Sequence, residues 1–225
     1  MLLFAVTLLA QYDFYMNKKN IVVLVSGGGT NLQALIDAQK SGLIKNGEIS
    51  LVISSKEGAY ALERAKNNGI NTCVLPRKNY SDNRSYSEAL LKILDEHNAD
   101  LIVYAGFMTI LDDCVCQKYE NKMMNVHPAL IPSFCGKGYY GLHVHEEVLK
   151  SGVKVTGATV HFVTAICDGG PIILQKAVDV KTGDTPEILQ KRVMEEAEWK
   201  ILPKAVSLFC EDKIVIKNNI ASIVE

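Results

Sequence analysis

Residues 21–41 read IVVLVSGGGTNLQALIDAQKS, and this stretch decides the fold. The unbroken apolar run from Ile21 to Val25 is typical of a strand that is buried on both faces of a sheet. Glycines follow it, and the residues from Asn31 to Ser41 have the apolar spacing of a helix. A buried strand that passes through glycines into a helix is the first unit of an α/β fold with a parallel sheet.

Further units of the same kind follow along the chain. Strands are expected over residues 51–54, 73–75 and 101–104, with helices over residues 59–68 and 81–97 between them. Gly69 is expected to end the first of these helices, and Ser81 to cap the start of the second. Because parallel strands need crossover connections, this order predicts right-handed crossovers and helices on both faces of the sheet.

The pattern changes in the second half of the chain. Strands are expected over residues 122–126, 158–163 and 172–180, the last two forming an antiparallel pair, and a long helix is expected over residues 185–209. Pro203 is expected to break or kink this helix late. The predicted fold is a single-domain, Rossmann-like α/β fold, in which a parallel half is followed by a mixed or antiparallel extension of the sheet and a long C-terminal helix.

Length and charge limit the possible functions. The chain has 225 residues without repeats or linkers, which predicts one domain, over residues 16–225. Residues 1–15 are expected to be a disordered extension or a mis-annotated start, with a membrane contact of their apolar part as the alternative. The formal charge of -1 gives no signal for nucleic acid or an anionic membrane. Scattered cysteines are expected to be reduced thiols, as in a cytoplasmic protein.

The glycine-rich stretch at residues 26–32 indicates a phosphate site. Glycines let backbone N–H groups approach a ligand, and the start of the following helix adds the positive end of its dipole. Gly29, Thr30 and Asn31 are therefore candidates for holding a phosphate. The lysine of a nucleotide-binding P-loop is absent, and Leu32 replaces the third glycine of a dinucleotide fingerprint. A tight turn that needs glycine only for steric reasons is the other interpretation.

Asn125, His127 and Asp168 are the candidate catalytic residues. Alternation along a strand places Asn125 and His127 on one face, where an amide donor and an imidazole suit a reaction in which a carbonyl oxygen gains charge and a proton moves. Asp168 lies in a glycine-rich turn at the end of another strand, from which it can reach this pair. Each residue taken alone is also typical of a structural role, and the combination with the glycine-rich stretch favours a catalytic one.

Several stretches of the chain resemble the glycinamide ribonucleotide formyltransferase family. They are SGGGTNLQ at residues 26–33, AGFM at 105–108, NVHPALIPSF at 125–134, GATVHFV at 157–163 and DGGPII at 168–173, and the likeness runs from about residue 20 to about residue 209. The resemblance implies the formyltransferase fold and direct formyl transfer from 10-formyltetrahydrofolate to the amine of glycinamide ribonucleotide, through a tetrahedral intermediate, in de novo purine biosynthesis. It also implies a monomer or homodimer that needs no metal and no nucleic acid partner.

The resemblance also implies roles for individual residues. Asn125 and His127 stabilise the oxyanion, His127 takes part in proton transfer, and Asp168 orients His127 and a water. Glu198 is the acid that contacts the ribose hydroxyls. The residues that bind the folate co-substrate are Met108, Thr109, Ile110 and Leu111 around the pterin, together with Asn125, and Arg84 at the glutamate tail.

The chain departs from the family pattern in places. Thr109 stands where some members carry arginine, and the spacing around Arg84 differs slightly from the family's. The loop at residues 135–141 is longer than in the most compact members, which leaves a mobile lid and a surface elaboration as alternatives. His161 is expected to support the site from a core-facing position, and a metal site that joins His127 to the histidines at 143 and 145 is disfavoured because no carboxylate accompanies them.

Other functions remain as alternatives. A formyltetrahydrofolate hydrolase is expected to carry an additional N-terminal domain, and a methionyl-tRNA formyltransferase an additional C-terminal RNA-binding domain. A non-catalytic nucleotide-binding or folate-sensing module has no need of the three candidate catalytic residues. A nicotinamide oxidoreductase is disfavoured by the incomplete glycine pattern.

Overall fold

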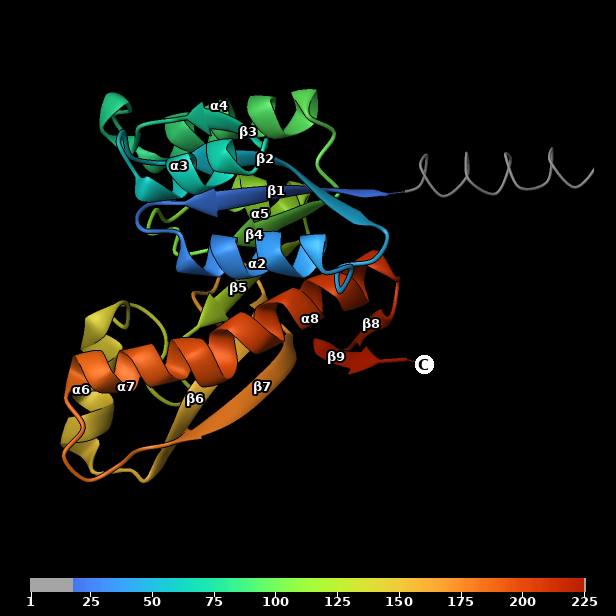
Figure 1. Cartoon of the computed structure of the whole chain (residues 1–225). Coiled ribbons are helices and arrows are strands. Elements are labelled where there is room, and N and C mark those ends of the chain that lie inside the picture. Colours follow the sequence, from blue (N-terminus) through green and yellow to red (C-terminus); the bar gives the residue numbers. More distant parts are fainter. Residues whose placement is uncertain (1–17, 225) are drawn as a thin grey trace, which may run out of the picture.

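The computed structural model describes residues 18–224, and the expected extension at residues 1–15 lies outside the described residues (Figure 1). The strands are β1 Lys19–Val25, β2 Gly47–Ser54, β3 Asn71–Val74, β4 Leu101–Tyr104, β5 Met123–His127, β6 Val155–Phe162, β7 Ile172–Asp179, β8 Ile214–Lys217 and β9 Ile220–Ile223. The α-helices are α2 Thr30–Lys40, α3 Tyr60–Asn67, α4 Asn83–Glu96, α5 Asp113–Lys118, α6 Leu142–Ser151, α7 Pro186–Val193 and α8 Trp199–Cys210. Within the described residues, no helix is long and apolar enough to cross a bilayer.

The strands form a seven-stranded sheet in the order β3-β2-β1-β4-β5-β6-β7. Strands β1 to β5 are parallel, and β6 and β7 extend the sheet with antiparallel pairing. This arrangement confirms the predicted parallel half and its antiparallel extension. The chain runs from β1 outward to β3 and then returns to the other side of β1 at β4. The chain therefore leaves β1 and β4 in opposite directions along the sheet. The place between these two strands is a topological switch point, where α/β sheets bind ligands.

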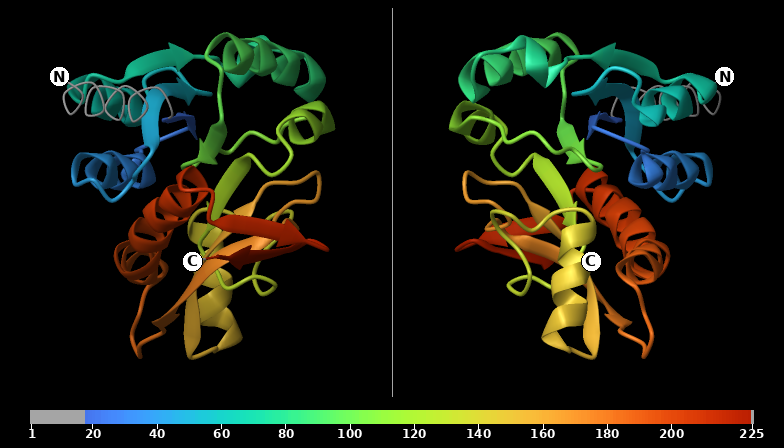
Figure 2. Two further views of the ribbon diagram at one scale, coloured as in Figure 1. Left: turned by 90° about the vertical axis from the view of Figure 1, so that its right-hand side faces the viewer. Right: turned by 90° about the vertical axis from the view of Figure 1, so that its left-hand side faces the viewer.

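Helices cover both faces of the sheet, as predicted (Figure 2). Helices α2, α3, α6, α7 and α8 pack on one face, and α4 and α5 pack on the other. The residues from Ile21 to Val25 in β1 are fully buried because side chains alternate between the two layers. The unbroken apolar run from Ile21 to Val25 is thus explained by a strand in the middle of a covered sheet.

The C-terminal helical run differs from the prediction in where it becomes irregular. Helix α7 passes through a π-helix at Met194–Glu198 into α8, and α8 continues beyond Pro203 to Cys210. The irregular turn thus lies before Pro203, and the helix does not break at Pro203 as predicted. A π-turn shifts the side chains after it around the helix axis, and such turns are frequent at functional sites.

Other local predictions were incomplete. Asp82, not Ser81, caps α4, because the Asp82 carboxylate accepts a hydrogen bond from the backbone N–H of Ser85. Helices α5 and α6 and the β8–β9 hairpin were not predicted. The hairpin turns at Asn218 and Asn219, both in the left-handed region, and this conformation suits a two-residue hairpin loop.

Candidate active site

The loops after β1 and β4 meet at the switch point through Ser26. The hydroxyl of Ser26 accepts a hydrogen bond of 3.0 Å from the backbone N–H of Met108 and lies 2.7 Å from the hydroxyl of Ser55. Residues at the ends of three parallel strands are joined in this way. The predicted phosphate loop and the predicted folate segment therefore begin at one place in the fold.

The glycines of the phosphate loop have different structural roles. Gly29 is in the left-handed region (φ 71°), and a Cβ there would lie 2.6 Å from the Cβ of Ala61 in α3. A side chain at Gly29 is thus excluded by packing against α3. A Cβ at Gly27 or Gly28 would meet nothing within 4 Å. These two glycines leave the outer side of the loop open for a ligand.

Asn31 and Glu198 connect the start of α2 to the π-turn. Asn31 is buried, and its Nδ2 donates a 2.7 Å hydrogen bond to Glu198 Oε2, while its Oδ1 has no partner in the described chain. Burial raises the pKa of Glu198 to about 7, although the hydrogen bond from Asn31 acts in the opposite direction. The predicted phosphate and ribose residues are thus brought together, with Thr30 beside them at the first turn of α2.

Asn125 and His127 lie at the carboxyl end of β5. Antiparallel pairing sets Asn125 opposite His161 of β6, and Asn125 Nδ2 donates to His161 Nε2 at 3.3 Å. His127, two residues further on, has its ring on the same face of the sheet. His161 is buried and supports Asn125 from the next strand, as predicted for a core-facing residue.

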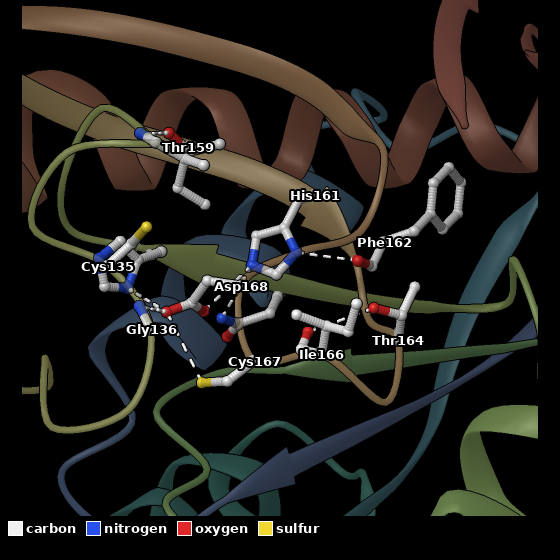
Figure 3. A network of polar contacts seen from close by, with 12 residues as sticks. Cys135, Gly136, Thr159, His161, Phe162, Thr164, Ile166, Cys167 and Asp168 are labelled. Carbon is white, nitrogen blue, oxygen red and sulfur yellow. Dashed lines mark hydrogen bonds and ion pairs between the residues drawn. The ribbon is translucent and has the colours of Figure 1, made fainter. Parts of the chain in front are cut away.

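Asp168 approaches His127 and His161 from the turn between β6 and β7, and Figure 3 shows it beside His161. Its Oδ2 lies 3.6 Å from His127 Nδ1, its Oδ1 lies 3.5 Å from His161 Nε2, and the backbone N–H of Gly136 donates to Oδ2 at 2.8 Å. Asp168 has a left-handed backbone (φ 54°), which aspartate tolerates better than most residues. The turn is held at Gly170, where a Cβ would lie 1.9 Å from the carbonyl oxygen of Phe162.

The surroundings of Asp168 keep its carboxyl group ionised. Burial raises its pKa, but the hydrogen bond with His161, the charge of His127 and the N–H of Gly136 outweigh burial and lower that pKa to about 2. Burial lowers the pKa of His127, and the charge of Asp168 opposes this effect. At neutral pH the site therefore contains an aspartate anion beside a neutral His127 imidazole.

Carbonyl partners fix the tautomers of the two imidazoles. His127 Nε2 donates to the carbonyl of Phe134, and His161 Nδ1 donates to the carbonyl of Phe162, each at 2.8 Å. In the neutral His127 ring, Nδ1, which faces Asp168, therefore carries a lone pair instead of a proton. A lone pair facing a carboxylate at 3.6 Å favours a proton on that nitrogen, because the negative charge of Asp168 stabilises an imidazolium. The cluster is thus built to accept a proton.

The predicted folate segment after β4 is only partly packed into the protein. The side chains of Met108 and Ile110 are 51% and 68% exposed, whereas Leu111 packs against the core layer under α4 and α5. Thr109, between them, is half-buried. Exposed apolar side chains beside the switch point are suited to contact a flat aromatic ligand.

Arg84 lies at the edge of this segment. It pairs with Glu88 at 2.7 Å within α4 and with Asp112 at 3.0 Å at the start of α5. Both pairs are exposed, so each contributes little to stability and a ligand carboxylate can replace it. The structure thus places Arg84 beside Asp112, at the end of the folate segment.

The loop at residues 135–141 belongs to the site instead of projecting from it. Gly136 contacts Asp168, and Tyr139 packs between Phe134 and His143. The centre of the Tyr139 ring lies 6.4 Å from that of Phe134 and 6.0 Å from that of His143. His143 is exposed and pairs with Glu146, whereas His145 is fully buried on α6. The described residues contain no group of three or more His, Cys, Asp or Glu arranged to hold a metal ion.

Sequence reasoning did not single out every residue that contacts the site. The carbonyl of Phe134, the N–H of Gly136 and the hydroxyl of Ser26 all have defined contacts there. Backbone groups leave no signal in residue type, so no pattern could have indicated the first two. Ser26 directly precedes the glycines, and a serine at the end of a buried strand was the available signal.

Comparison with known proteins identifies the family. The formyl transferase family matches residues 19–206. Phosphoribosylglycinamide formyltransferase of Escherichia coli is 40% identical over 202 residues, which is 90% of this chain and 92% of the relative. The chain belongs to the phosphoribosylglycinamide formyltransferase family.

Other members of the formyltransferase family are similar to this chain in sequence and in fold. The trifunctional purine biosynthetic protein adenosine-3 of Gallus gallus is 43% identical over 89% of this chain, which spans only about a fifth (19%) of that relative's length. The crystal structure of glycinamide ribonucleotide transformylase 1 from Symbiobacterium toebii superposes with a TM-score of 0.87 at 40% identity, covering 93% of this chain and 95% of that one. The formyltransferase fold predicted from the sequence is thereby confirmed.

Proposed function

We propose that this chain transfers the formyl group of 10-formyltetrahydrofolate to the amine of 5-phosphoribosylglycinamide, giving formylglycinamide ribonucleotide in de novo purine biosynthesis. The observation that carries the proposal is the cluster of Asn125, His127, His161 and ionised Asp168 at the carboxyl end of β5. The family relationship supports formyl transfer, and the cluster supplies the groups that this reaction needs.

The ribonucleotide binds along the first turn of α2. Its phosphate accepts hydrogen bonds from the open loop at Gly29, Thr30 and Asn31, where the helix dipole favours an anion. Its ribose hydroxyls meet Glu198, whose carboxyl group already contacts Asn31. This orientation directs the glycinamide amine toward the carboxyl end of β5.

The amine then attacks the formyl carbon of the folate. A bond forms between the amine nitrogen and the formyl carbon, and the carbonyl oxygen takes a negative charge in the tetrahedral intermediate. Asn125 donates to this oxygen with the amide hydrogen that His161 does not use, because His161 accepts only one of the two. Collapse of the intermediate breaks the bond from the formyl carbon to N10 of the folate.

A proton must move from the attacking amine to N10 during this sequence. His127 and Asp168 form the relay, because the unprotonated Nδ1 of His127 faces the Asp168 carboxylate at 3.6 Å. The charge of Asp168 stabilises the imidazolium when His127 holds the proton. No covalent enzyme intermediate is needed.

The folate lies against the segment after β4. The pterin contacts Met108, Thr109, Ile110 and Leu111, and the formyl end reaches Asn125. Arg84 exchanges its exposed acidic partners for a carboxylate of the glutamate tail. We also propose a cytoplasmic enzyme, a monomer or a homodimer, which has these small molecules as partners, needs no metal, and binds neither nucleic acid nor membrane.

The test is a spectrophotometric assay of the purified protein with a 10-formyl folate analogue, in which 5-phosphoribosylglycinamide is added last. Release of deformylated folate only after the ribonucleotide is added supports the proposal. Release without the ribonucleotide indicates a formyl-folate hydrolase. Binding of folate without release under either condition indicates a sensing module.

A further inference from the structure

Helix α3 holds the carbonyl groups of the phosphate loop. The backbone N–H of Ala61, in the first turn of α3, donates to the carbonyl of Gly27 at 3.1 Å. Arg64, one turn later, donates from Nε to the carbonyl of Gly28 at 2.8 Å. Two successive carbonyls of the loop are therefore turned toward α3 and fixed there.

The N–H groups of the loop are left free by this arrangement. Within residues 18–224, the N–H groups of Gly28, Gly29 and Thr30 donate to no acceptor of the chain. A peptide plane has its carbonyl and its N–H on opposite sides, so a carbonyl held toward α3 points the N–H of the next residue outward. Arg64 thus fixes the direction of a donor that a bound phosphate requires.

The guanidinium of Arg64 is itself held in place. Its Nη1 donates to Gln33 Oε1 at 3.1 Å, and its central carbon lies 5.0 Å from the centre of the Tyr60 ring. Its Cδ lies 3.5 Å from the position that a Cβ of Gly29 would occupy. A full positive charge is therefore fixed beside the loop, on a side chain whose planar fork suits this pair of acceptors.

We propose that Arg64 is a positioning residue for the substrate phosphate: it orients the Gly28 peptide and adds positive charge beside the bound phosphomonoester. The inference rests on the proposed function for the identity of the substrate. It does not require that Arg64 touch the reacting atoms, and it predicts an effect on binding of the ribonucleotide instead of on the chemical step.

The first experiment compares Arg64→Met, which keeps the length of the stem but removes charge and fork, with Arg64→Lys, which keeps only the charge. Arg64→Met is expected to raise KM for 5-phosphoribosylglycinamide at least about tenfold, with kcat and KM for the folate within about twofold of wild type. The KM of Arg64→Lys for the ribonucleotide is expected to lie between those of wild type and Arg64→Met. Lys66→Met is the matched control, since Lys66 is on the same helix but pairs only with exposed Glu63.

The second experiment measures phosphate binding without turnover. Calorimetric titration with ribose 5-phosphate is expected to give a weaker Kd for Arg64→Met, and a shallower dependence of Kd on salt, because one cationic group near the anion is lost. A merely structural role for Arg64 would lower the unfolding temperature without changing this salt dependence.

The outcomes separate this inference from the proposed function. Equal affinity of wild type and Arg64→Met for ribose 5-phosphate overturns the inference, whether or not formyl transfer occurs. Arg64-dependent binding of ribose 5-phosphate by a wild-type protein that does not formylate the ribonucleotide overturns the proposed function and supports the inference. If Arg64→Met does not fold, as judged by circular dichroism, Arg64→Lys alone decides, and unchanged KM and Kd in that variant overturn the role of the fork.

Discussion

Asp168 is the residue on which the proposed proton relay depends. Asp168→Asn removes the charge without changing the volume, and kcat is expected to fall roughly a thousandfold with both KM values nearly unchanged. The carboxylate raises the pKa of His127 against burial, so the variant is also expected to titrate His127 at lower pH. Steady-state kinetics and an NMR titration of the His127 ring measure the two effects.

The control for this variant is Asp113→Asn, at an exposed acid in the first turn of α5. It is expected to leave both measurements unchanged. Wild-type kcat in Asp168→Asn would contradict the relay. A rise in the pKa of His127 would show that Asp168 is not the charge that His127 senses.

Two neighbouring glycines of the phosphate loop give a second prediction. Gly29→Ala places a Cβ against Ala61 in a left-handed backbone conformation and is expected to cost about 1–3 kcal/mol of unfolding free energy. Gly28→Ala meets no atom and is expected to fold normally but to raise KM for the ribonucleotide, because its methyl group occupies the ligand side of the loop. Denaturant unfolding and kinetics of both variants test the distinction. A Gly29→Ala protein as stable as wild type would show that α3 lies further from the loop.

The buried carboxyl group of Glu198 in the π-turn contacts Asn31 at the start of α2. Because burial shifts the pKa of this group, the stability of the protein is expected to depend on pH. Glu198 has a pKa of about 7 in the folded protein, above its ordinary 4.5. Because this pKa is raised, the contribution of Glu198 to the free energy of unfolding is fully present below pH 4.5 and is lost as the pH rises through 7. The wild-type protein is therefore expected to lose on the order of 3 kcal/mol of unfolding free energy between pH 5 and pH 8, and Glu198→Gln is expected to abolish this loss.

Urea unfolding at pH 5 and pH 8 measures this difference. Glu195→Gln changes an exposed acid of the same π-turn, 3.8 Å from Lys191. This variant is expected to retain the wild-type dependence of the unfolding free energy on pH. An identical slope in Glu198→Gln and wild type would show that Glu198 is ionised in the folded protein at all these pH values.

Elements were predictable where a local pattern specifies them. The strand from Ile21 and the helix after it follow from an apolar run and a helical period, and β4 was predicted with its observed bounds. Helix α5 has only six residues, too few to show a period, and α6 follows a glycine-rich loop and begins with two histidines that are also typical of a functional site. The π-turn was not predictable from local propensity, and its Glu198 contacts Asn31, which is distant in the sequence.

The arrangement of the site depends on the whole molecule. Asn125 and His127 share a face because of local alternation, which the sequence shows. His161 meets Asn125 only because of the register between β5 and β6, and Asp168 meets His127 only because β6 and β7 extend the sheet on that side. Long-range register has no signature in residue spacing, so the sequence indicated that Asp168 can reach the pair but not which atoms meet.

The two ends of the chain are expected to differ in what they contribute. In the β8–β9 hairpin, Ile214, Ile216 and Ala221 pack against the core layer that contains α8, so deletion of residues 213–225 exposes apolar surface. This deletion is expected to lower the unfolding free energy by on the order of 2 kcal/mol while leaving kcat and both KM values unchanged at 25 °C, since no proposed site residue lies in the hairpin.

Deletion of residues 1–15 is expected to change neither stability nor turnover, because the sheet, both core layers and every proposed site residue lie within residues 18–224. Thermal unfolding and steady-state kinetics of the two truncated proteins test the pair of predictions. A loss of stability on removing residues 1–15 would mean that this segment packs on the domain. A loss of activity on removing the hairpin, at a temperature where the protein remains folded, would mean that α8 needs the hairpin to keep Glu198 against Asn31.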